Sequence, residues 1–132
     1  MLHHISLPVR NIETSASMYD AALPELGYRR VCVGKAFVGY GFDNDKDRFA
    51  IKQSEETACA SPQFHLAFSA PSRESVDAFY RAALNHGGTD NGPPGLRPHY
   101  GADYYAAFII DCDGHHIEAV HNKPTDDSHC AP

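Results

Sequence analysis

Apolar and polar residues alternate at the start of the chain and again near its middle. Ile5, Leu7 and Val9 occupy every second position of the first stretch, and Leu66 and Phe68 do so in the second. A period of two is typical of a β-strand that buries one face. Each stretch is followed by a few polar residues and then by apolar residues at helical spacing. The pattern therefore predicts a strand followed by a helix, twice.

The predicted helices have recognisable ends. In the second copy Ser72 is a suitable N-cap, because its hydroxyl can accept a hydrogen bond from an unpaired backbone N–H. The glycine pair at 87–88 supplies the positive φ that ends a helix. The helix of the first copy covers about residues 13–23, and Pro24 and Gly27 close it.

Strand-like segments follow each helix. The sequence Asp111-Cys112-Asp113-Gly114 predicts a hairpin turn, because Asp-Gly supports the backbone angles that such turns require. Residues 91–101 hold three prolines and three glycines, which predicts a loop with at most one short strand. The predicted strands are residues 28–33, 36–42 and 48–53 in the first half and residues 104–111 and 115–121 in the second.

The two halves also match each other residue by residue. With a shift of 61 positions (65 minus 4), the stretch beginning at His3 falls on the stretch beginning at Phe64 without a gap. Such an internal repeat predicts two similar units related by an approximate twofold, and so an α+β domain over residues 1–121. The units cover about 1–60 and 61–121, and residues 122–132 form a tail. The matched pairs include His4 with His65, Glu13 with Glu74, and Tyr19 with Tyr80.

The repeat relates two histidines that could share a metal ion. Because Ile5 and Leu66 face the helices, strand alternation puts His4 and His65 on the opposite face. In the last strand Ile117 fits the helix side, which sends Glu118 to the face of the histidines. Two neutral imidazoles and a carboxylate can hold a divalent ion with open positions for substrate oxygens. His3 and His115 are expected to face outward.

Composition narrows the possible partners. The chain has 132 residues and a formal net charge of −6, with no block of basic residues, which argues against nucleic acid and anionic membrane surfaces as partners. No apolar run approaches the roughly 18 residues that a membrane span needs. The N-terminal residues lack the pattern of a signal peptide, so a cytoplasmic location is expected. The four cysteines form no Cys-x-x-Cys pair and are expected to be free thiols.

Three stretches resemble a known family. HHISLPVRNIETSASMYDAAL near the N-terminus, FHLAFSAPSRESVDAFYRAAL in the middle and DCDGHHIEAV near the end are similar to the vicinal oxygen chelate superfamily of glyoxalases, extradiol dioxygenases, and fosfomycin- and bleomycin-resistance proteins. The resemblance implies two βαβββ modules that form an open barrel-like cavity around a divalent metal, often in a homodimer. Carried over by position, the metal ligands would be His4, His65 and Glu118. The metal could be iron, manganese, nickel, zinc or magnesium.

One position departs from the glyoxalase I pattern. That enzyme usually has a further glutamate in the last strand of its first module, and repeat logic places this position near Lys52. A charged lysine cannot ligate a metal, so the sequence favours a three-ligand site or a pocket that has lost its metal. Lys52 is then a candidate for substrate binding.

Other candidates come from the loop and the strand after it. A guanidinium, an imidazole and phenols suit an anionic or aromatic oxygenated ligand, and an imidazole or phenol near the metal could act as acid or base. The candidates for substrate binding are Arg97, His99, Tyr100 and Tyr104, and those for acid–base catalysis are His121 and Tyr105.

Three functions are compatible with these features. The leading one is a glyoxalase-like, metal-dependent enzyme of lyase, isomerase or dioxygenase type that chelates two adjacent oxygens of a small molecule. The alternative is a metal-free binding or sequestering protein of the bleomycin-resistance type. A structural dimerisation domain with a vestigial pocket is the third.

Overall fold

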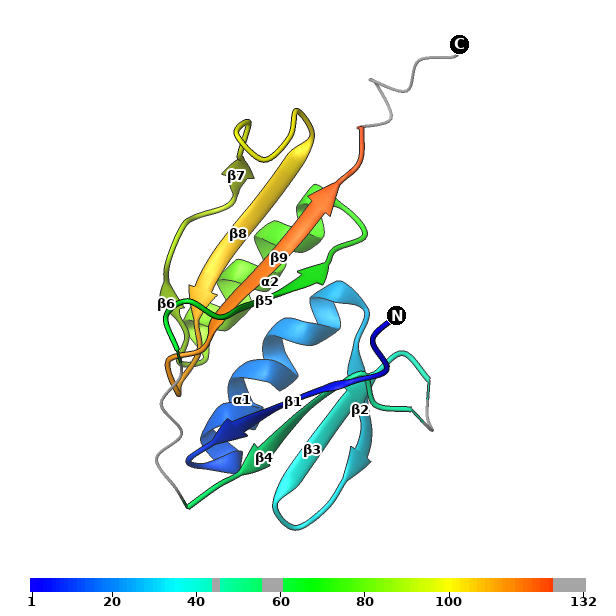
Figure 1. Cartoon of the computed structure of the whole chain (residues 1–132), viewed down its shortest axis with the longest axis vertical. Helices are drawn as coiled ribbons and strands as arrows, with labels where there is room; N and C mark the ends of the chain where they lie inside the picture. The colour runs from blue at the N-terminus through cyan, green and yellow to red at the C-terminus, as the bar shows by residue number, and fades with distance from the viewer. Residues whose placement is uncertain (44–45, 56–60, 125–132) are drawn as a thin grey trace.

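The computed structural model describes residues 1–43, 46–55 and 61–124, and the predicted tail lies mostly outside this part. Two open sheets stand next to each other, each with one helix on its inner side (Figure 1). The first half contains β1 (Ile5–Val9), α1 (Ile12–Ala22), the 3₁₀ helix η1 (Leu23–Leu26), β2 (Arg29–Val33), β3 (Phe37–Gly41) and β4 (Phe49–Gln53). The second half contains β5 (His65–Ser69), α2 (Arg73–Asn85), β6 (Thr89–Asp90), β7 (Gly95–Leu96), β8 (Tyr104–Ile110) and β9 (His116–Asn122).

The two halves share one topology. The first sheet has the order β1-β4-β3-β2, and the second has the order β5-β9-β8-β6, with β7 also pairing with β8. In each sheet the strand before the helix runs parallel to the last strand of its half, and the other pairs are antiparallel. The predicted α+β fold of two repeated units is thus confirmed. The loop with one short strand is confirmed as well, since β7 has two residues.

The helix ends follow the sequence signals. The hydroxyl of Ser72 accepts a hydrogen bond of 3.1 Å from the backbone N–H of Ser75, as predicted, and the side chain of Asn11 accepts one from Thr14 at the start of α1. Gly27 and Gly87 have φ values of 95° and 104°. This left-handed conformation is accessible to glycine at little cost, so the chain turns here toward the following strands.

The core lies between the sheets and the two helices, which pack against each other. Leu7, Val9 and Phe68 are buried on the helix face of their strands, as alternation predicts. Ile117 in β9 is buried on the same side. Because these positions face the helices, the intervening positions of each strand face away from them, and these carry the candidate site. Neither helix of the described chain has the length and apolar character to cross a bilayer.

The turn between β8 and β9 joins the two halves. Asp111 accepts a hydrogen bond of 2.6 Å from the phenol of Tyr19, and Asp113 accepts one of 2.7 Å from the hydroxyl of Ser15. A ring nitrogen of His115 donates to the carbonyl of Pro8 at 2.8 Å. The expectation that His115 faces outward was wrong, because it is only 5% exposed and bonds across the two halves.

Candidate metal site

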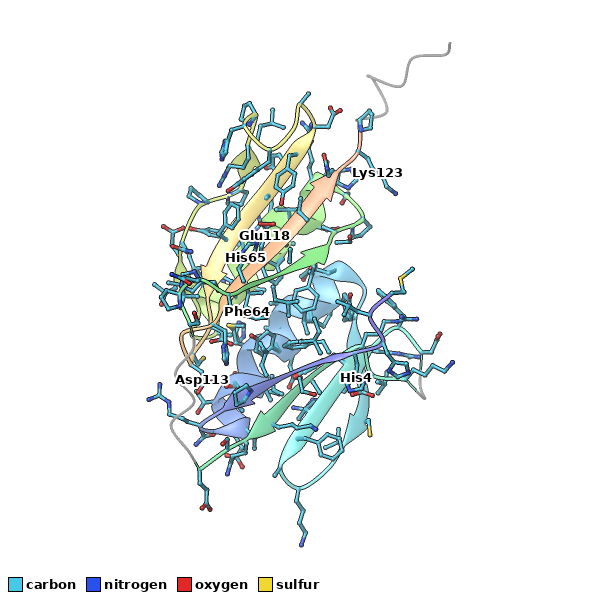
Figure 2. The ribbon with its side chains drawn as sticks, viewed as in Figure 1. His4, Phe64, His65, Asp113, Glu118 and Lys123 are labelled. Atoms are coloured by element: carbon cyan, nitrogen blue, oxygen red, sulfur yellow. The ribbon has the colours of Figure 1, made fainter. Side chains whose placement is uncertain are left out.

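His65 and Glu118 come together on the outer face of the second sheet. The parallel pairing of β5 and β9 sets His65 opposite His116 and Ala67 opposite Glu118, so that these side chains share one face. Figure 2 shows His65 and Glu118 next to each other on this sheet. Both line a cavity of about 210 Å³. The prediction that the histidine of the repeat and the glutamate of the last strand share a face is therefore confirmed for this half.

The carboxylate of Glu118 is held in a fixed position. The residue is 2% exposed, and its Oε2 accepts a hydrogen bond of 2.6 Å from the phenol of Tyr104. Its Oε1 has no hydrogen-bond partner within the described residues, and it is not sealed from the cavity. Burial, and then the bond to Glu118, raise the pKa of Tyr104, so the phenol stays protonated and keeps donating. Glu118 thus presents one free oxygen to the cavity.

Three aromatic side chains pack in a row beside the cavity, and the last of them, Tyr104, bonds to this carboxylate. The ring centroids of His99 and Tyr100 are 4.1 Å apart, and those of Tyr100 and Tyr104 are 5.2 Å apart. Tyr100 lines the cavity and is 61% exposed, so its ring is available to a ligand. Arg97 lies over the ring of Phe108, with 5.2 Å from its Cζ to the centroid. The loop predicted to bind substrate therefore borders the cavity.

His4 lies on the other half of the molecule. It precedes β1, is exposed, and lines a separate cavity of about 180 Å³ between the two halves. Figure 2 shows it apart from His65 and Glu118. Within the described residues, no three His, Cys, Asp or Glu side chains are grouped closely enough to hold a metal. The Nδ1 atoms of His3 and His4 are 2.8 Å apart and share a hydrogen bond, and Nε2 of His4 has no hydrogen-bond partner among the described residues.

The two predicted acid–base residues do not face this cavity. β8 pairs with β9 so that Tyr105 lies opposite His121. Both residues are an odd number of positions along their strands from the pair of Phe108 and Glu118. Alternation therefore turns both toward the helix side. The phenol of Tyr105 donates to Asp77 of α2 at 2.6 Å, and burial followed by this bond raises its pKa to about 12. A ring nitrogen of His121 donates to the carbonyl of Ala70.

The register of the first sheet corrects the interpretation of Lys52. Ala67, opposite Glu118, corresponds to Ser6 by the shift of 61 positions, and Ser6 pairs with Ala50. The counterpart of Glu118 is therefore Ala50, and Lys52 is two residue pairs further along, opposite Pro8. Ala50 is 1% exposed, whereas the Lys52 side chain is exposed. The placement near Lys52 was wrong because sequence spacing alone does not fix the register of paired strands.

Several lining residues were missed from the sequence. Phe108 pairs directly with Glu118, and Asn91 lines the same cavity from the loop after β6. Phe108 could have been found by counting across the predicted hairpin from Glu118, since cross-strand partners face the same way. No sequence signal singled out Asn91, whose position depends on the path of the loop.

Comparisons with known proteins agree with this architecture. The family model of the Glyoxalase/Bleomycin resistance protein/Dioxygenase superfamily matches residues 1–119. The chain belongs to this superfamily. A glyoxalase/bleomycin resistance protein from Albidiferax ferrireducens T118 is similar in structure, with a TM-score of 0.78 and 33% identity over 92% of this chain and 97% of that one. None of the curated proteins matches the chain significantly.

More distant superfamily members share the fold. A glyoxalase-related enzyme from Fulvimarina pelagi has a TM-score of 0.71 at 18% identity, over 99% of this chain and 96% of that one. The fosfomycin resistance protein FosX from Mesorhizobium loti has a TM-score of 0.66 at 20% identity, over 96% of both chains. These two likenesses establish the fold and carry no further assignment.

The donors fit the kind of metal that members of the superfamily commonly use. An oriented carboxylate with one free oxygen and an imidazole on the neighbouring strand are ligands for divalent ions such as iron, manganese, nickel and zinc. The second sheet thus carries two side chains of a type that can ligate such an ion.

Proposed function

We propose that this protein is a metal-dependent enzyme that binds two adjacent oxygens of a small molecule, with His65 and Glu118 as ligands from one chain and His4 from a second copy. The observation that carries the proposal is the buried Glu118 carboxylate, whose Oε1 faces a cavity that also contains His65. Burying a carboxylate is costly unless it is paired, hydrogen-bonded or bound to a metal. The single bond from Tyr104 satisfies only one of its two oxygens.

The need for a second copy follows from the arrangement of the repeats. His4 and His65 are equivalent by sequence, yet they line two different cavities of one chain. A twofold-related copy could bring its own His4 over the second sheet of the first, and the reverse contact would complete the second site. The free Nε2 of His4 is the atom available for such a contact.

The proposed reaction would depend on Lewis-acid activation of the substrate. A divalent ion with two imidazoles and one carboxylate keeps open positions, and when bound it polarises substrate oxygens as a Lewis acid. The chain itself fixes the carboxylate through Tyr104 and offers the exposed face of Tyr100 to an aromatic or unsaturated substrate. Arg97, beside Phe108, lies close enough to the cavity wall to attract an anionic substrate group. Whether the reaction is of lyase, isomerase or dioxygenase type depends on the substrate.

Elemental analysis tests the proposal. Untagged protein is reconstituted separately with iron, manganese, nickel, zinc or magnesium, and the bound metal is measured beside Glu118→Gln and His4→Gln. We expect one metal per chain for the preferred ion and its loss in both variants. Glu13→Gln, which removes an exposed carboxylate far from the cavity, serves as the control and should retain the metal. Absence of metal from the wild type with every ion would overturn the proposal in favour of a sequestering protein.

A further inference from the structure

A second cavity lies at the other end of the strands that carry His65 and Glu118. It is lined by residues at the carboxyl ends of β5 and β9 together with residues of the first half, and its volume is about 380 Å³. The cavity beside Glu118 has about 210 Å³ and shares no lining residue with it. Figure 2 shows Lys123 at the end of the ribbon beyond β9, away from Glu118. We call this second cavity the junction cavity.

The internal repeat shows that the fold does not require a cavity of this size. Residues 70–71, which line the junction cavity, correspond to residues 9–10 at the matching junction of the first half. There Asp113 accepts hydrogen bonds from the backbone N–H of Arg10 and the hydroxyl of Ser15, and the remaining hollow has only about 130 Å³. The two junctions have therefore diverged, one closed by polar contacts and the other open.

One wall of the junction cavity is apolar. Phe42 is 49% exposed, although its ring packs 4.4 Å from that of Tyr28 and the Arg48 guanidinium lies 5.9 Å from it. These neighbours hold the ring in place, so its exposed face is a fixed surface. An aliphatic chain lying on this wall would bury apolar area, which stabilises binding. The other apolar residues of the wall are Leu26, Ala70, Pro71 and Val120.

The lining of the junction cavity also includes an oriented histidine. Nδ1 of His121 lies 2.9 Å from the carbonyl oxygen of Ala70. A carbonyl only accepts, so Nδ1 carries the hydrogen, and in the neutral ring Nε2 is then an acceptor. Nε2 has no partner among the described residues. It is therefore available to accept a hydrogen bond from a ligand hydroxyl.

A lysine lies two residues further along the same strand end. Lys123 directly follows the last residue of β9, and both it and His121 line the junction cavity. Lys123 forms no salt bridge within the part of the chain that the structure describes. Among the described residues no carboxylate lines the cavity, although the chain has a net charge of −6. The cavity is thus a local basic site on an acidic protein, which favours an anionic ligand.

We propose that the junction cavity is a second ligand site that takes a 2-hydroxycarboxylate with an aliphatic chain. The carboxylate pairs with the ammonium of Lys123, the hydroxyl donates to Nε2 of His121, and the chain lies on Phe42 and the apolar wall. The site is independent of the metal site, so either can exist without the other.

Three probes of matched chain length test each contact. Binding of 2-hydroxyoctanoate, octanoate and methyl octanoate to the full chain is followed by the backbone amide shifts in two-dimensional ¹H–¹⁵N spectra. We expect saturable shifts at residues 69, 70 and 120–123, with affinity falling in the order in which the probes are named. Each step should be about threefold to tenfold, as for one hydrogen bond or one partly screened ion pair.

Two variants separate the contacts. His121→Asn keeps a donor to Ala70, because its amide nitrogen lies near the position of Nδ1, but it lacks an acceptor at the position of Nε2. This variant should therefore bind 2-hydroxyoctanoate and octanoate with equal affinity. Lys123→Gln should make the affinities for octanoate and methyl octanoate equal. Glu118→Gln should bind all three probes like the wild type, which separates this site from the metal site. The proposal is overturned if no probe gives saturable shifts, if the shifts centre on Glu118 and His65, or if neither variant changes the order.

Discussion

The phenol of Tyr104 donates a hydrogen bond of 2.6 Å to Oε2 of Glu118, so that Oε1 is the oxygen of this buried carboxylate left without a partner among the described residues. Tyr104 was predicted to touch substrate, but the structure places its hydroxyl on the candidate metal ligand. A hydrogen bond of this kind fixes the orientation of the ligand before the metal arrives. It also explains why a tyrosine stands at this position of β8, with its ring packed on Tyr100.

Tyr104→Phe is expected to weaken metal binding without loss of the fold. The variant keeps the ring stack and removes only the hydroxyl, and loss of such a supporting contact costs about tenfold to a hundredfold in metal affinity. Metal titration by isothermal calorimetry measures the effect. Tyr100→Phe, which keeps the stack and makes no bond to Glu118, is the control. Equal affinity of Tyr104→Phe and the wild type would show that the bond does not position the carboxylate.

A shared metal site predicts complementation between two inactive variants. His4→Gln and Glu118→Gln should each lose the metal. A mixed dimer would contain one site with both changes and one intact site, made from the His4 of one chain and the His65 and Glu118 of the other. After co-refolding of equal amounts, we expect about one quarter of the wild-type metal content from random pairing of chains. If His4 served the site of its own chain, the mixture would hold no metal.

The register of β1 and β4 predicts that Lys52 does not oppose the metal. Since the counterpart of Glu118 is Ala50, the charge of Lys52 lies two residue pairs away along β4 from the position of a fourth ligand. Lys52→Gln should therefore change metal affinity by less than about threefold, the size of a screened surface interaction. The comparison is made with Lys35→Gln, another lysine of the same half. A large gain in affinity for Lys52→Gln alone would mean that this lysine faces the ion.

The raised pKa of Asp111 predicts that the free energy of unfolding depends on pH. Burial raises its pKa above the ordinary value, although the bonds from Tyr19 and from the backbone of the turn act in the opposite direction. The folded protein therefore binds this proton more tightly than the unfolded chain does, so the contribution of Asp111 to the free energy of unfolding falls as pH rises from about 4 through the folded pKa. Below about 4 both states are protonated, and the contribution is fully present.

Asp111→Asn removes this titration and keeps the shape of the side chain. The free energy of unfolding of the variant, relative to the wild type, should increase as pH rises over this interval. Urea unfolding at a series of pH values measures it, with the exposed Asp43→Asn as the control for a change of charge. A difference that stays constant with pH, or that decreases, would contradict the assigned shift. Asp111→Ala should be less stable than the wild type at all these pH values, because it also leaves the phenol of Tyr19 unpaired.

Local patterns were sufficient for most of the fold. Alternation at Ile5, Leu7 and Val9, the cap at Ser72 and the Asp-Gly turn each depend on residues close together in the chain, and each was confirmed. The internal repeat added the relation between the two halves. That His65 and Glu118 share one face of their sheet could be predicted as well, because alternation fixes the face of each side chain once the apolar side of its strand is known.

The remaining features depend on contacts between segments far apart in the chain. The register of β1 against β4 shows that the counterpart of Glu118 in the first half is Ala50 and not Lys52. The turn between β8 and β9 places His115 in a buried position, where it bonds to the carbonyl of Pro8. Alternation within β8 and β9, read from the face of Glu118, turned Tyr105 and His121 to the helix side. The sequence by itself determined which faces are apolar and which residues repeat, since both are local properties. Only the tertiary structure decided register, the separation of His4 from His65 and the junction cavity, because these depend on how distant elements pack together.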